Sequence, residues 1–213
     1  MKKYLPILRS CPFFMGLKDT EILSILHCVN AVKVSKASRS YIFKAGDSTE
    51  VMGLVLTGST LIIQEDLWGH RNILSKCNAG DFFGEPYAAT PGTVLNISVV
   101  AEEDCDILFL NIKRLLMSCP TACDHHQKLI RNLVRVLANK ILILNDKITH
   151  VSKRSTRDKL LSYLSSESVK KSSLSFDIPF DRQQLADFLC VERAAMSVEL
   201  SKLQKEGLLK TNR

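Results

Sequence analysis

The side chains best suited to recognition chemistry lie near the C-terminus, within residues 180–203. An arginine can donate two parallel hydrogen bonds to the edge of a guanine, and short side chains let a helix lie close to the bases in the major groove. One helical face combines these residue types at helical spacing: Arg193, Ala194, Ser197, Val198 and Ser201. This pattern predicts a DNA-contact face whose main polar reader is Arg193.

Two short helices joined by a turn around Cys190 would position this face. Asp181 and Gln184 form a capping-box pair at the start of the first helix, and Phe180 with Leu185 forms a hydrophobic staple. The apolar positions of both helices keep helical spacing: Leu185, Ala186, Leu189, Met196, Leu200 and Leu203. We predict a helix-turn-helix, against the alternative of an ordinary helical hairpin in a core. We expect the β-wing that commonly follows such a pair to be incomplete.

The composition is that of a globular protein with a sizeable core. The chain has 213 residues, of which 46% are hydrophobic and 24% charged, and we expect two domains, residues 1–151 and 152–213. No apolar run reaches the roughly 20 residues that span a bilayer, and the N-terminus does not resemble a signal peptide, so neither a membrane partner nor export is expected. Seven scattered cysteines indicate a reducing cytoplasm rather than a disulfide framework.

The charge distribution favours a polyanionic partner for the C-terminal part. The net charge is +7, and residues 152–213 carry twelve Lys and Arg against eight Asp and Glu. No nucleophile–base pair, strongly spaced metal motif or Walker-type phosphate loop is recognisable. We therefore expect a protein that binds double-stranded DNA and is not an enzyme.

Residues 40–110 consist of short β-rich runs separated by turn residues at regular spacing. This texture predicts a β-sandwich or jelly-roll barrel of about 70 residues, which makes the fold class α+β. Alternation within two of the runs places Leu54, Leu56, Leu61 and Ile63 on the inner face of the barrel. A short amphipathic helix is predicted before it, ending near His27 and Cys28, and a short strand is predicted between residues 168 and 180.

A long helix is predicted over about residues 111–151. Its apolar residues step alternately by four and three for three heptads: Ile130, Val134, Leu137, Ile141, Leu144, Ile148 and Val151. So narrow a seam favours packing against another helix, most simply the same helix of a second copy, and we predict a parallel homodimer. The alternative is a helix that packs only on its own barrel. A two-fold dimer would present two recognition helices to a pseudo-palindromic DNA site.

The order of these parts resembles the CRP/FNR family of bacterial transcription regulators. The resemblance rests on the sequence FFGEP at residues 82–86, the heptad helix and the helix-turn-helix, and covers almost the whole chain. It implies a barrel that senses an effector, a dimerisation helix and a winged helix-turn-helix that binds promoter DNA and often helps recruit RNA polymerase. Arg193 matches a position that commonly contacts guanine, whereas Arg182 and Gln183 match phosphate contacts. Ala194 and Val198 replace polar readers, so we expect a distinct operator.

The sensor loop departs from the cyclic-nucleotide-binding members that it resembles. Gly84, Glu85 and Pro86 are present, but Leu95 and Asn96 stand where those members carry an Arg-Ser pair that binds the phosphate. Without that cation an anionic phosphate loses a charge-assisted hydrogen bond, so tight cAMP binding is not expected. Alternatively, Glu85 only stabilises its own turn. The effector is a small molecule of unknown identity, or the protein uses none.

The cysteines and histidines offer weaker candidate sites. Soft ligands to a metal, or a redox pair, could come from a cluster at the start of the long helix: Cys119, Cys123, His125 and His126. The alternative is a partly buried helix start. Cys11 and Cys28 do not form the closely spaced set of an iron–sulfur site, and Cys77 with His70 is only weakly suggestive of haem. Neither cofactor is expected. A small-molecule-binding module with a degenerate helix-turn-helix, or a cysteine-based sensor, is the alternative function.

Overall fold

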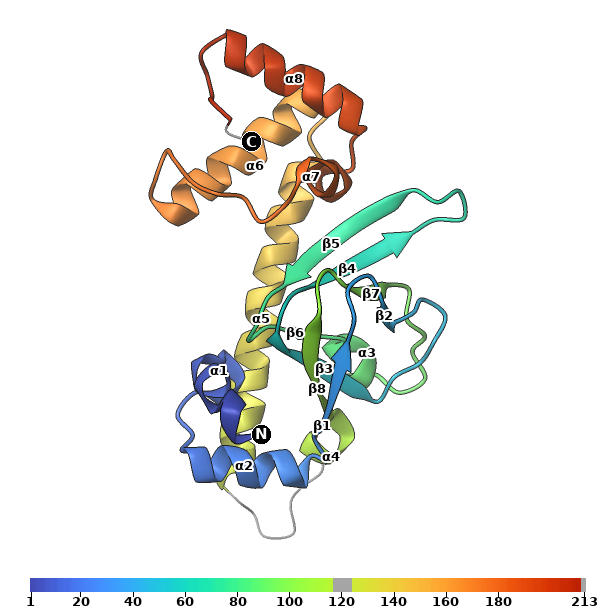
Figure 1. Cartoon of the computed structure of the whole chain (residues 1–213), viewed down its shortest axis with the longest axis vertical. Helices are drawn as coiled ribbons and strands as arrows, with labels where there is room; N and C mark the ends of the chain where they lie inside the picture. The colour runs from blue at the N-terminus through green and yellow to red at the C-terminus, as the bar shows by residue number, and fades with distance from the viewer. Residues whose placement is uncertain (117–123, 212–213) are drawn as a thin grey trace.

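The computed structural model describes residues 1–116 and 124–211. In that part, eight strands form two antiparallel sheets packed face to face (Figure 1). The first has the order β1-β8-β3-β6: Val32–Lys36, Cys105–Asn111, Val51–Thr57 and Phe82–Phe83. The second has the order β2-β7-β4-β5: Tyr41–Phe43, Ser98–Ala101, Thr60–Glu65 and Arg71–Cys77. The predicted jelly roll is confirmed.

Strand β1 lies outside the predicted β-region. It pairs antiparallel with β8, Val32 opposite Phe109, at the edge of its sheet. Its valines alternate with polar residues, but all of its side chains are exposed or half-buried, so neither side of the strand belongs to the core.

Both faces of the central strands are buried, which makes the predicted inner face wrong. Val55 and Ile62 face the interior between the sheets, together with Phe83 and Val99. The residues predicted to face inward lie on the outer sides: Leu54, Leu56, Leu61 and Ile63. Alternation alone cannot assign a face when helices cover the outside of each sheet.

Helices at the N-terminus cover the outside of the first sheet. They are η1 (Lys2–Tyr4), α1 (Leu5–Ser10), η2 (Pro12–Phe14) and α2 (Asp19–Cys28). Their buried side chains form one apolar cluster with Leu54, Leu108 and Leu129. The predicted helix that ends near His27 and Cys28 is therefore confirmed as α2. A further short helix, α3 (Glu85–Ala89), follows β6.

The predicted long helix is described in two parts, on either side of residues 117–123, which lie outside the described residues. A separate helix α4 covers Ile112–Leu116, and α5 then runs over Asp124–Val151 alongside the sandwich to the C-terminal domain (Figure 1). Among the described residues, no helix has the length and apolarity needed to cross a bilayer.

The C-terminal domain consists of α6 (Thr156–Lys171), α7 (Arg182–Leu189) and α8 (Arg193–Lys205). Its core combines Leu160 and Tyr163 of α6 with the apolar faces of α7 and α8. The short strand predicted between residues 168 and 180 does not form: α6 extends to Lys171, and residues 174–180 lie without a partner strand. The residues described after Lys205 contain no strand either.

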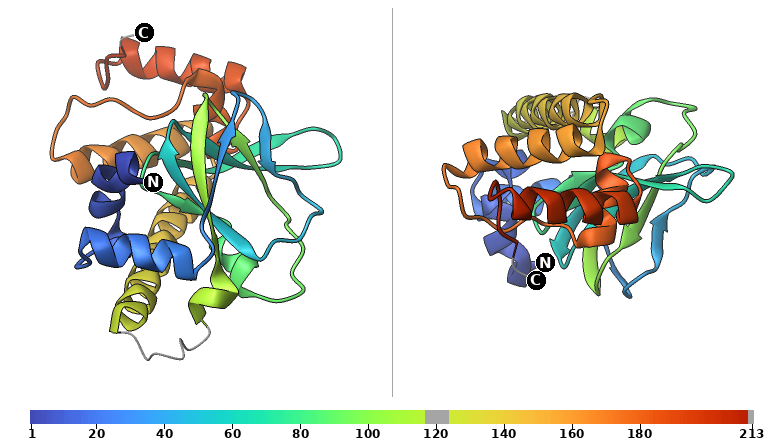
Figure 2. Two further views of the ribbon diagram at one scale, coloured as in Figure 1. Left: turned by 60° about the horizontal axis from the view of Figure 1, so that its bottom comes forward. Right: turned by 90° about the horizontal axis from the view of Figure 1, so that it is seen from above.

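Figure 2 shows that the hairpin formed by β4 and β5 extends well beyond the rest of the sandwich. Its tip carries Leu67 and Trp68, both highly exposed. Strand β5 of this hairpin packs against α7 and accepts hydrogen bonds from Lys147 of α5, so the barrel and the C-terminal domain are in direct contact.

Candidate nucleic-acid interface and sensor loop

The predicted DNA-contact face of α8 is exposed to solvent. Its five predicted residues, Arg193, Ala194, Ser197, Val198 and Ser201, are all exposed. The opposite face buries Met196, Leu200 and Leu203 against Leu185, Ala186 and Leu189 of α7. An amphipathic helix fixed along one side in this way can insert its other side into a groove.

The hydroxyl groups on this face are turned back to the helix. Ser197 Oγ donates to the carbonyl oxygen of Arg193, and Ser201 Oγ donates to that of Ser197, each at 2.9 Å. Such i to i−4 bonds occupy the hydroxyl proton and leave the oxygen lone pairs available. Arg193, the first residue of α8, therefore offers the strongest donor group on the face.

The start of α7 is capped as the sequence predicts. Asp181 accepts a hydrogen bond from the backbone N–H of Gln184 at 2.8 Å, and Gln184 Oε1 accepts one from the backbone N–H of Asp181 at 3.1 Å. Arg182 is half-buried, whereas Gln183 is exposed and donates to Asp187 Oδ1 at 2.8 Å. Both predicted phosphate contacts thus lie in the first turn, where backbone N–H groups favour anions.

Cys190 adopts a left-handed conformation in the turn, with φ 53° and ψ 57°. A side chain at such a position costs about 1–2 kcal/mol relative to glycine. Lys159 Nζ of α6 donates to the carbonyl of Cys190 at 3.1 Å and to that of Leu189 at 3.4 Å, so the end of α7 is capped.

Most of the heptad seam of α5 is not covered by its own barrel, although Leu137 packs at the edge of the core. Val134, Ile141, Leu144 and Ile148 are exposed, and the remaining seam residues Ile130, Leu137 and Val151 are half-buried. A neighbouring face of the same helix packs on its own chain through Leu129, Leu133, Lys147 and His150. The two faces are adjacent, so α5 can contact its barrel and a second helix at once.

The sensor loop is held by a lysine from α5. Glu85 begins α3 and is 1% exposed, and its Oε1 lies 2.6 Å from Lys140 Nζ. Lys140 also donates to the carbonyl of Phe82 at 2.5 Å. A Cβ added to Gly84, which has φ +81°, would lie 2.7 Å from Phe43 Cε2, so glycine is required here.

Leu95 and Asn96 point in different directions. Leu95 is buried in the core between the sheets, whereas Asn96 is exposed and accepts a hydrogen bond from the hydroxyl of Tyr87. Pro86 is exposed as well. The structure brings Asn96 close to Tyr87 rather than to a cation, and the positive charge nearest Glu85 belongs to α5.

Two domain families match the chain. Residues 33–119 match the cyclic nucleotide-binding domain, and residues 158–213 match the Crp-like helix-turn-helix domain. The CRP-like protein Clp of Xanthomonas campestris is 23% identical over 177 residues, which is 81% of this chain and 77% of Clp. The cAMP-activated global regulator CRP of Pasteurella multocida is 28% identical over 102 residues, about half of either chain (48% and 49%). The chain belongs to the CRP/FNR family of transcription regulators.

Solved structures agree with the assignment of the fold. X. campestris CLP superposes with a TM-score of 0.74 at 19% identity, covering 92% of this chain and 96% of that one. FixK2 of Bradyrhizobium japonicum gives 0.64 at 18% identity, covering 86% and 89%. By its two matched domain families, this CRP/FNR regulator has an effector-type barrel joined to a DNA-binding domain.

The candidate metal and redox residues of this CRP/FNR regulator are only partly placed. Cys119 and Cys123 lie outside the described residues. His125 Nδ1 lies 3.5 Å from Glu21 Oε1 of α2, and His126 is buried. Within residues 1–116 and 124–211, no three His, Cys, Asp or Glu side chains are grouped as a metal site would require.

The other candidate cofactor ligands, three cysteines and His70, have ordinary structural environments. Cys77 is buried, and desolvation raises the pKa of its thiol to about 11, so it stays protonated at neutral pH. His70 lies near the other end of β5, where its Nδ1 is 2.8 Å from Asp66 Oδ2. Cys11 is buried and donates to the carbonyl of Gly80, and Cys28 is exposed at the end of α2.

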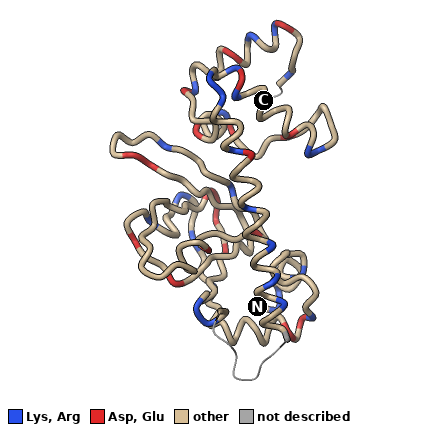
Figure 3. The backbone as a smooth tube through the Cα atoms, turned by 180° about the vertical axis from the view of Figure 1, so that it is seen from behind, with Lys and Arg blue, Asp and Glu red and all other residues tan. Residues whose placement is uncertain are grey.

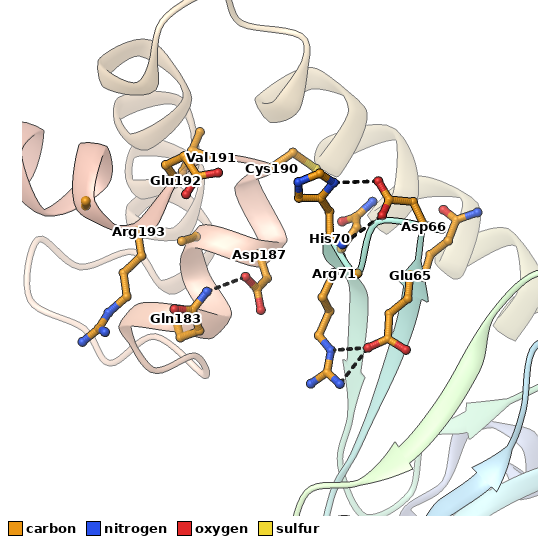
Figure 4. A pocket seen from close by; sticks show the side chains of 15 residues that line it. Glu65, Asp66, His70, Arg71, Gln183, Asp187, Cys190, Val191, Glu192 and Arg193 are labelled. Atoms are coloured by element: carbon orange, nitrogen blue, oxygen red, sulfur yellow. Dashed lines mark hydrogen bonds and ion pairs between the residues drawn. The ribbon is translucent and has the colours of Figure 1, made fainter.

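A cleft separates the β4–β5 hairpin from α7 and the start of α8 (Figure 4). On the hairpin side Arg71 pairs with Glu65 at 2.8 Å, and on the α7 side burial raises the pKa of Asp187. Arg193 points away from the hairpin. Figure 3 shows Lys and Arg spread over both domains and interspersed with Asp and Glu, so the placement of a few cations matters more than the net charge.

Sequence reasoning missed Lys140 and Lys147, two lysines of α5 that contact the barrel. Their spacing of seven residues was a usable signal, because it places both on the same side of a heptad helix. Nothing in the sequence, however, indicates what each ammonium group contacts.

Proposed function

We propose that this CRP/FNR regulator acts as a homodimer that inserts two copies of α8 into successive major grooves of a pseudo-palindromic promoter site. The observation that supports this most is the exposed face of α8, with Arg193 at its start and a buried opposite side. Arg193 is the base-reading residue, and Arg182 and Gln183 contact phosphates. Ala194 and Val198 make apolar contacts that would suit thymine methyl groups.

The dimer is proposed from the composition of the α5 seam. In the central heptads Val134, Ile141 and Ile148 occupy the a positions and are β-branched, whereas Leu137 and Leu144 occupy d positions; the two d positions at the ends of the seam hold Ile130 and Val151. This distribution favours two parallel strands over higher assemblies. Residues 1–151 form the sensing and dimerising part in this proposal and residues 152–213 the DNA-binding part. The protein works in the cytoplasm and contacts RNA polymerase at its promoter.

The effector is proposed not to be cAMP. Residues 86–96 contain no Lys or Arg that could pair with a cyclic phosphate, and the carboxylate of Glu85 is already paired with Lys140. X. campestris CLP is described as c-di-GMP responsive. Calorimetric titration should therefore compare cAMP with c-di-GMP, and micromolar binding of cAMP would contradict this part of the proposal.

The test of DNA binding is selection of duplexes from a random-sequence pool by the full-length protein. We expect a two-fold symmetric motif whose half-sites are about one helical turn apart, bound with a steep dependence on salt. Arg193→Ala should weaken binding by about 1–3 kcal/mol and relax the preference at one base pair per half-site. Lys202→Ala, on the same helix, is the control. If neither the wild type nor the Lys202→Ala control enriches any sequence, a degenerate DNA-binding domain is favoured.

A further inference from the structure

The outer side of the β4–β5 hairpin carries an apolar patch that the sandwich does not cover. Ile63 and Ile73 are register partners on this face, Leu61 lies beside them, and all three are buried. The side chains packed on them include Phe180 and Phe188, from the C-terminal domain. Without that domain the patch would be exposed to water on an extended hairpin, an unfavourable arrangement.

Lys147 joins three elements at this point. Its ammonium group, on α5, donates to the carbonyl of Ile73 at 2.5 Å and to Asn72 Oδ1 at 2.7 Å, both on β5. It also lies 4.9 Å from the centre of the Phe188 ring of α7, within cation–π range. The residue is only 6% exposed, so these contacts replace water around the charge.

A second set of contacts lies at the start of α7. Gln184 Nε2 donates to Glu102 Oε1 of the barrel at 2.6 Å, and Lys76 Nζ of β5 lies 2.6 Å from Glu102 Oε2. Lys76 also donates to the carbonyl of Pro179 at 3.2 Å, just before α7. The C-terminal domain is thus held by apolar and polar contacts on the same side.

These contacts leave the DNA-contact face of α8 exposed. The barrel meets α7, whereas Arg193, Ser197 and Val198 of α8 stay exposed. A domain connected to α5 only through residues 152–155 could otherwise adopt many orientations, and aligning two such domains on one DNA site would cost conformational entropy.

We propose that the junction of Lys147, Ile63, Ile73 and Phe188 is a positioning latch. It holds the DNA-binding domain, relative to the dimerisation helix, in an orientation that can bind DNA. This inference rests on the proposed function, since orientation matters only if both domains bind one site. Lys147 is a positioning residue: it contacts the hairpin and α7 and does not touch DNA. The latch makes DNA affinity depend on residues of the barrel that are remote from the DNA.

The experiment compares latch variants with matched controls in the full-length protein. Ile73→Lys places a cation in the apolar patch beside Lys147, and Leu67→Lys adds the same charge at the 98% exposed hairpin tip. Lys147→Ala removes the central ammonium group, and Lys128→Ala removes an exposed one from the same helix. Two quantities are measured: hydrogen exchange of the α7 amides, and affinity for the duplex selected by the wild-type protein.

We expect faster exchange in α7 and a roughly ten-fold loss of affinity for both latch variants, with little change for both controls. Unchanged exchange and affinity in both latch variants would overturn the latch. Thermal unfolding and sedimentation establish that each variant stays folded and keeps the oligomeric state of the wild type. If the wild type selects no duplex, the proposed function fails, and the exchange data alone still decide whether the junction holds α7.

Discussion

Lys140 Nζ of α5 lies 2.6 Å from Glu85 Oε1 at the start of α3, so in this CRP/FNR regulator the long helix pairs a cation with a buried carboxylate of the barrel. The Glu85 side chain is 2% exposed, whereas that of Lys140 is 29% exposed. The acidic partner therefore depends on the pair more strongly than the basic one does, because water can still solvate the ammonium group.

Removal of the lysine alone should destabilise the protein. Lys140→Met leaves a buried carboxylate without its cation, and we expect the free energy of unfolding to fall by about 3 kcal/mol at pH 7. The loss should shrink in the double variant with Glu85→Gln, because no unpaired buried carboxylate is left. Urea unfolding of the four proteins gives the coupling between the two residues. Additive losses would contradict a paired interaction.

Two adjacent exposed residues of α5, one inside the heptad seam and one outside it, provide a test of the proposed dimer. Ile141 is 58% exposed at an a position, and Leu142 is 63% exposed outside the seam. We expect Ile141→Asp to shift sedimentation from dimer to monomer at tens of micromolar, because it would bury a carboxylate against its symmetry mate. Leu142→Asp should leave the dimer intact. Equal dissociation by both variants would argue for an interface elsewhere on α5.

Local chemistry made the DNA-binding domain predictable. The Asp181–Gln184 capping box, the two apolar stripes and the exposed α8 face are all encoded within a few residues, and each is present in the structure. The same holds for α2 and for the division of the jelly roll into short strands. In these cases the sequence pattern and the local structure have the same period.

Long-range contacts account for the features that the sequence did not predict. Leu61 and Ile63 alternate as an inward-facing strand would, yet α7 covers them from outside. Strand β1 alternates valine with polar residues over only a few positions, and its place in the sheet depends on pairing with β8, more than 60 residues further along the chain. Lys140 and Lys147 look like surface residues of a charged helix, and their burial depends on how α5 crosses the barrel. Such contacts join residues more than 50 positions apart, where local spacing carries no information.

Replacing Cys190 with glycine should stabilise the turn of the helix-turn-helix. Its left-handed backbone favours glycine, so Cys190→Gly should raise the free energy of unfolding by about 1 kcal/mol. Cys190→Ala keeps the Cβ and should change it much less. Chemical unfolding measures both. Equal effects of the two substitutions would indicate that the thiol, rather than the backbone conformation, sets the stability of the turn.

Burial of Lys147 should make stability depend on pH in the alkaline range. Desolvation lowers its pKa from 10.5 to about 8, so between pH 8 and 10.5 the unfolded chain binds more protons at this residue than the folded one. The contribution of Lys147 to the free energy of unfolding should therefore rise with pH across this window, by up to about 3 kcal/mol.

Other groups oppose this trend, so the comparison must be made between variants. Burial raises the pKa of Cys11 and Cys77 to about 11, and each thiol lowers stability as pH rises above 9, because the unfolded thiol ionises first. Subtracting the pH profile of Lys147→Met from that of the wild type removes their contribution. A difference that stays constant from pH 7 to 10.5 would show that Lys147 titrates as a solvent-exposed lysine, which would contradict its burial at the latch.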